Sequence, residues 1–67
     1  MTHTIPCPRN ITDFLGYSHQ KGEDVRVQVL HQSDGSIVVD VMDPVNHSLI
    51  TVLGFDNERE AREEGWV

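Results

Sequence analysis

Two runs of alternating apolar and polar residues occupy the middle of the chain. In residues 24–31 every second residue is a valine, and in residues 36–42 isoleucine or valine again recurs at every second position. A polar loop that contains Gly35 separates the two runs. Alternation with a period of two on both sides of a glycine-bearing turn is typical of a β-hairpin. The pattern therefore predicts two antiparallel strands that share one apolar face.

The register of this hairpin depends on the length of its loop. A two-residue loop would place Val29 opposite Asp40, whereas a loop of residues 33–35 places Val29 opposite Val39. A slip of one residue changes which side chains share a face, so the pairing of valine with valine favours the longer loop. This loop also puts Gly35 in the left-handed position of its turn, where a residue without a Cβ atom avoids strain.

A third strand is expected over residues 48–54, after a turn that begins at Asp43–Pro44. The three strands would form an antiparallel β-meander. A three-residue turn places the odd-numbered residues of this strand, such as Leu53, on the face of Val39, and a four-residue turn places the even-numbered residues there. We favour the first arrangement.

Residues 57–64 predict a short C-terminal helix. Either residue of Asp56–Asn57 is a suitable N-cap, and Gly65 is a suitable end. Ala61 is the only apolar side chain inside the helix, so its docking must depend on flanking residues such as Trp66. Two glutamate–arginine pairs at i, i+4 spacing add a few tenths of a kcal/mol each.

The first residues of the chain are expected to be extended and then to form one helical turn. Residues 1–9 contain Pro6 and Pro8, which exclude a helix. Residues 11–16 have apolar side chains at i, i+3 and i+4, which predicts a short helical turn that covers the sheet. Whether this turn and the C-terminal helix cover the same face is left open. The expected fold class is α+β, with residues 10–67 as the core of one small domain.

Length and cysteine content narrow the class of protein. A chain of 67 residues buries only about 60% of the surface that its unfolded form exposes, so its stability margin is thin. The single cysteine excludes an intramolecular disulfide, and the chain shows no signal-peptide pattern and no apolar run long enough to cross a membrane. These features predict a cytoplasmic protein without a membrane segment.

The net charge of −6 argues against nucleic-acid binding, which requires clustered lysine and arginine. It favours a protein partner with a basic surface. The candidate acidic surface consists of carboxylates from the predicted helix and from the strand ends. These residues are Glu23, Asp24, Asp40, Asp43, Glu58, Glu60, Glu63 and Glu64.

The second face of the predicted sheet is an alternative binding surface. It carries apolar residues among polar ones, and they could serve a partner or a second copy of the chain. These residues are Leu30, Val38, Met42 and Val52.

Metal binding and catalysis have little support in the sequence. His3, Cys7, His19 and His47 could converge on a zinc ion, but no paired-ligand spacing supports such a site. No nucleophile has a recognisable base and orienting group, and no phosphate-binding loop is present. We therefore expect no catalytic residues and no cofactor.

The leading interpretation is a non-enzymatic protein-binding module. Its small size and acidity suggest a regulator or inhibitor that docks on a larger bacterial or phage-targeted assembly. The alternatives are a structural homodimer and, third, a small metal-binding module.

Overall fold

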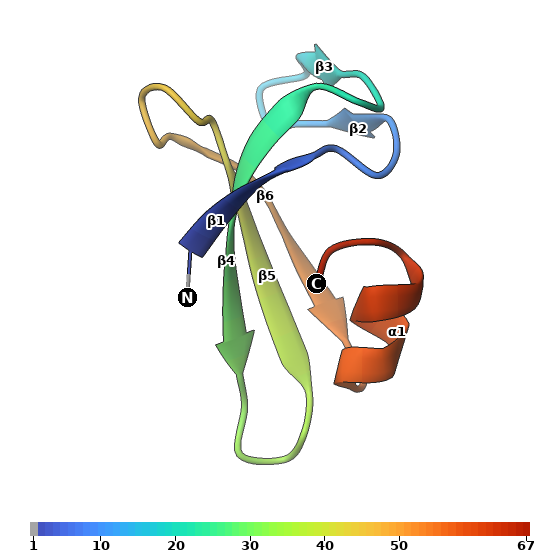
Figure 1. Ribbon diagram of the computed structural model, residues 1–67. Coiled ribbons are helices and arrows are strands. Elements are labelled where there is room, and N and C mark those ends of the chain that lie inside the picture. The colour runs from blue at the N-terminus through green and yellow to red at the C-terminus, as the bar shows by residue number, and fades with distance from the viewer. Residues whose placement is uncertain (1) are drawn as a thin grey trace.

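The computed structural model describes residues 2–67, which form two antiparallel sheets and one short helix (Figure 1). The larger sheet has four strands in the order β1-β4-β5-β6, and the smaller sheet pairs β2 with β3. In chain order the elements are β1 (Thr2–Pro6), β2 (Ile11–Thr12), β3 (Ser18–His19), β4 (Asp24–His31), β5 (Ile37–Met42), β6 (Leu49–Phe55) and α1 (Glu58–Glu63). The protein is thus mostly sheet, with antiparallel pairing throughout the described part.

The β4–β5 hairpin has the predicted register. Val29 lies opposite Val39, so the longer loop is correct. The N–H of Gln32 donates to the carbonyl of Ser36 at 2.9 Å and closes this loop. Gly35 has a φ of +91°, the left-handed conformation that the loop requires.

Strand β6 completes the predicted meander, with an irregularity at its start. Leu53 lies opposite Val39, as favoured from the sequence. The pairing shifts between Val41 and Met42, which is the signature of a β-bulge. The bulge turns Ile50 into the core, so the simple odd–even alternation fails at the first two residues of the strand.

The prediction of a three-stranded sheet is wrong, because the N-terminal segment adds a fourth strand. Residues 1–9 were predicted only to be extended, and the structure shows that β1 pairs with β4 and places Ile5 opposite Val25. Pro6 ends this strand at the edge of the sheet, a position where a missing N–H is tolerated. The N–H of Cys7 then donates to the carbonyl of Glu23 at 2.7 Å and continues the attachment.

The predicted helical turn over residues 11–16 is also wrong. The segment forms β2, a tight turn and β3 instead, with the N–H of Asp13 donating to the carbonyl of Tyr17 at 2.9 Å. A single helical turn gains one hydrogen bond for several fixed residues, so it is unfavourable alone. The Asp13 side chain binds nearby backbone N–H groups, which gives the chain an alternative to the helix.

Helix α1 has the predicted N-cap and the predicted terminal glycine, and at Glu58–Glu63 it is one residue shorter at each end than the predicted range 57–64. The Asn57 side chain accepts the N–H of Glu60 at 3.0 Å and caps the first turn. At the other end the N–H of Trp66 donates to the carbonyl of Ala61 at 3.0 Å, while Gly65 adopts a φ of +92°. The N–H of Gly65 donates to the carbonyl of Arg62, also at 3.0 Å, and the two bonds form a Schellman motif, which returns the chain to the core.

The core lies between the valine face of the larger sheet and the C-terminal segment. Trp66 is its largest side chain and is fully buried, and Ile11 and Leu53 pack against its border. The buried residues are Cys7, Val25, Val27, Ile37, Val39, Val41, Ile50, Ala61 and Trp66. Within residues 2–67 no helix is long and apolar enough to cross a membrane.

Candidate protein-binding site

Three large apolar side chains on the turn between β2 and β3 are mostly exposed to solvent. Phe14, Leu15 and Tyr17 are 73%, 70% and 68% exposed. From the sequence, this segment was expected to cover the sheet, and the side chains point outward instead. We call these three residues the apolar tip. Three large apolar residues exposed within one short turn form a candidate interaction site, since interaction sites are marked by exposed apolar patches.

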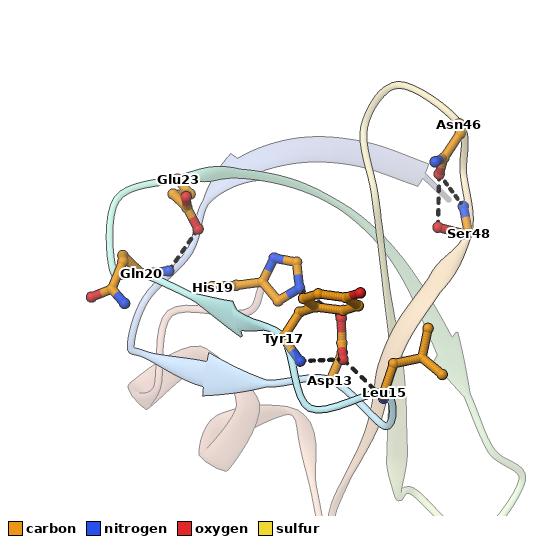
Figure 2. A network of polar contacts seen from close by, with 8 residues as sticks. All are labelled: Asp13, Leu15, Tyr17, His19, Gln20, Glu23, Asn46 and Ser48. Atoms are coloured by element: carbon orange, nitrogen blue, oxygen red, sulfur yellow. Dashed lines mark hydrogen bonds and ion pairs between the residues drawn. The ribbon is translucent and has the colours of Figure 1, made fainter.

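The backbone beneath the apolar tip is held by one carboxylate. Asp13 Oδ1 accepts the N–H groups of Leu15 and Tyr17, both at 2.9 Å. The N–H of Gly16 donates to the carbonyl of Asp13 at 3.0 Å and closes the same turn. Figure 2 shows the Asp13 carboxylate inside the turn, with Leu15 and Tyr17 around it. The tip therefore has a defined conformation although its side chains are exposed.

His19 connects this turn to the body of the hairpin. Its Nε2 atom lies 3.1 Å from the second carboxylate oxygen of Asp13, and both side chains are largely buried. This hydrogen bond, with those from the backbone of Tyr17 and Leu15, holds the pKa of Asp13 below its ordinary value. Asp13 is thus a charged acceptor at neutral pH, and charged acceptors form the stronger hydrogen bonds.

The β5–β6 loop lies at the same end of the larger sheet as the β2–β3 hairpin (Figures 1 and 2). Asp43 Oδ1 accepts the N–H groups of Val45 and Asn46 at 2.8 and 3.1 Å, which repeats the arrangement around Asp13. Asn46 in turn accepts two hydrogen bonds from Ser48. Val45 in this loop is 88% exposed.

The eight carboxylates of the predicted acidic surface are spread over three places. Glu23, Asp24 and Asp43 lie at the end of the sheet that carries the apolar tip, and Asp40 lies on the face opposite the core. The other four belong to α1 or its cap, and each has a local partner. These pairs are Glu58 with Arg62, Glu63 with Arg59, Glu60 with the N–H of Asp56, and Glu64 with Arg9.

The four apolar residues of the predicted second surface do share one face of the larger sheet. Leu30 lies opposite Val38. Val52 lies opposite Asp40, which is two residues after Val38 and therefore on the same face. Met42 faces Arg26, so charged groups interrupt this apolar surface. Leu30 and Val52 are 37% and 52% exposed, so each is less exposed than any residue of the apolar tip.

The candidate metal ligands have separate environments. The Cys7 thiol is buried and donates to the carbonyl of Arg9 at 2.9 Å. His19 binds Asp13, and His47 Nε2 lies 3.3 Å from an Arg26 nitrogen. His3 lies on β1, beside Val27. Among residues 2–67 no group of three His, Cys, Asp or Glu side chains could hold a metal ion.

Sequence reasoning missed the apolar tip because the spacing of Ile11, Phe14 and Leu15 imitates one face of a helix. One signal could have found it. An aspartate three residues before a glycine, as in Asp13–Gly16, is typical of a tight turn whose first side chain binds the backbone. Comparisons of the chain with known protein families, with curated proteins and with solved structures find no match.

Proposed function

We propose that this protein is a small non-enzymatic protein-binding module that docks on a larger partner through the apolar tip. The observation that carries the proposal is the exposure of Phe14, Leu15 and Tyr17 on a backbone that Asp13 already holds in place. A regulator or inhibitor is the role that best suits a chain of this size with an exposed apolar turn.

Burial of the tip side chains and preorganisation of the turn both favour binding. Full burial of a side chain such as Phe14 or Leu15 contributes roughly 1.5–3 kcal/mol. Binding energy at interfaces is concentrated in a few anchors, among which tyrosine is enriched. A loop that is ordered before binding loses less conformational entropy when the complex forms. The hydrogen bonds of Asp13 supply that order in the free protein.

Charge around the tip indicates the chemistry of the partner. Glu23, Asp24 and Asp43 lie at the same end of the sheet, and the net charge of the chain is −6. A partner with an apolar pocket and a basic rim would complement both features. Rim charges of this kind mainly accelerate association and lose their effect in salt.

The test is affinity capture from a lysate of the host with three forms of the tagged chain. The first is the natural protein, and the second is the variant F14S/L15S/Y17S. The third is the control L30S/V52S, which changes the face of the larger sheet opposite the core, here called the open sheet face. We expect the natural protein and the control to retain a common stoichiometric partner. The tip variant should bind it at least about a hundredfold more weakly, because three apolar anchors are lost together.

Thermal unfolding of the three forms provides the control for folding. All substituted side chains are exposed, so each variant should melt close to the natural protein. Equal capture by the natural protein and the tip variant would contradict the proposal. Loss of the partner in L30S/V52S alone would move the binding site to the open sheet face.

A further inference from the structure

A second surface, distant from the apolar tip in the fold, lies where α1 runs beside the free edge of β6 (Figure 1). A groove of about 460 Å³ separates the two elements. Leu53, Gly54 and Phe55 form its strand side, and Glu60, Glu63 and Glu64 form its helix side. Arg9 lies against Glu64 at 3.8 Å.

The strand side of the groove is an unpaired sheet edge. Strand β6 pairs with β5 on one side and is the last strand of the sheet on the other. Along an edge strand, alternate residues present an N–H and a carbonyl that have no partner strand, and such an edge can accept a further strand. Leu53 and Phe55 are half-buried, so they offer apolar contact beside these backbone groups.

The helix side of the groove is strongly acidic. Its lining holds three carboxylates and one guanidinium, that of Arg9, and each carboxylate uses one oxygen for a local partner. Glu60 Oε2 accepts the N–H of Asp56, Glu63 Oε1 accepts from Arg59, and Glu64 Oε1 lies near Arg9. A carboxylate can accept about four hydrogen bonds. Exposed ion pairs such as these exchange readily for others, because they contribute little.

We propose that this groove binds an extended basic segment of a protein partner, which adds to the sheet beside β6. An added strand directs every second side chain toward the face that carries α1. Lysine or arginine at these positions would reach Glu60, Glu63 and Glu64, and this charge complementarity selects a basic segment over an acidic one. The site is separate from the apolar tip and does not depend on it.

The probe is a short acetylated and amidated peptide of alternating lysine and threonine. Nuclear magnetic resonance of the natural, isotope-labelled chain would follow its binding. We expect saturable shifts and slower amide exchange at Leu53–Phe55, with no change at Phe14–Tyr17. A glutamate–threonine peptide should not bind, and methylation of alternate backbone nitrogens in the lysine peptide should abolish binding, because strand addition needs those N–H groups.

Two matched variants test the charges. E60Q/E63Q/E64Q should weaken binding about tenfold, the effect of three exposed ion pairs. D34N/D40N/E58Q removes the same number of charges outside the groove and away from the apolar tip, and it should leave binding almost unchanged. Equal weakening in both variants would reduce the effect to net charge and overturn the site. Absence of binding at millimolar peptide, or shifts that avoid β6, would overturn it as well.

Discussion

At the scale of single residues, Trp66 is the side chain on which the fold depends most. It is fully buried, and its backbone N–H closes the end of α1 by donating to Ala61. Its indole N–H is buried without a hydrogen-bond partner in the described part of the chain. One residue thus joins the helix, the valine face and the C-terminus, at the cost of an unsatisfied donor.

We expect Trp66→Ala to lower the free energy of unfolding by about 3–5 kcal/mol, since it empties the centre of the core. The total free energy of unfolding of a domain of this size is of similar magnitude, so the variant should be mostly unfolded at room temperature. Trp66→Phe keeps the aromatic packing and removes the unsatisfied N–H, so it should cost clearly less. Urea unfolding followed by circular dichroism measures both, and an alanine variant that melts within a degree or two of the natural protein would contradict this role.

Gly65 and Gly54 form a matched pair for backbone strain. Gly65 has a φ of +92°, and an added Cβ would lie 3.2 Å from the Pro8 Cβ atom. Gly65→Ala should therefore destabilise the protein by about 1–2 kcal/mol. An added Cβ at Gly54 meets nothing within 4 Å, so Gly54→Ala should be neutral or slightly stabilising. Equal melting temperatures for the two variants would contradict the strain that we expect from a side chain at position 65.

At the scale of elements, three turns are built on the same device. Asp13, Asp34 and Asp43 each accept hydrogen bonds from backbone N–H groups two to four residues ahead. The pKa of each is lowered, by His19 and the backbone at Asp13, by Ser36 at Asp34, and by the N–H groups of Asn46 and Val45 at Asp43. The turns are consequently ordered by groups that are charged at neutral pH.

This device predicts acid sensitivity. A carboxylate with a lower pKa in the folded chain than in the unfolded chain stabilises the fold above the unfolded pKa, which is near pH 4. That contribution is lost as the pH falls through the lowered folded pKa values. Urea unfolding as a function of pH should show constant stability in the weakly acidic range and a decline below about pH 4.

Asp13→Asn provides the control for the contribution of one turn. The amide can still accept the N–H of Leu15 but carries no charge, so the decline below pH 4 should be shallower than in the natural protein. The amide protons of Leu15 and Tyr17 should also exchange faster, because a neutral acceptor binds them more weakly. An unchanged pH profile would show that Asp13 does not stabilise the turn through its charge.

At the scale of the whole molecule, the central hairpin and the helix ends were predictable from local signals, and a distant strand pairing was not. The β4–β5 loop follows from valine alternation and Gly35, and the α1 ends follow from Asn57 and Gly65, since all of these act within a few residues. The pairing of β1 with β4 joins residues about twenty positions apart, and nothing in the N-terminal sequence names that partner.

The apolar tip was missed for a different reason. Its spacing fits a buried helical face, and burial was the expected fate of such side chains. The Asp13 carboxylate decides the outcome, because it stabilises a turn that leaves Phe14 and Leu15 in solvent. The candidate site therefore follows from competition between a weak helix signal and a local hydrogen-bonded turn.

Site-specific photo-cross-linking in the living host tests docking through the apolar tip most directly. A photoreactive benzophenone side chain would replace Phe14 in one form of the chain and Val52, on the open sheet face, in another. Both positions are exposed, so both forms should fold. We predict a single covalent adduct of larger mass from position 14, lost on adding Leu15→Ser and Tyr17→Ser, and none from position 52. An adduct from position 52 alone, or none from position 14, would contradict it.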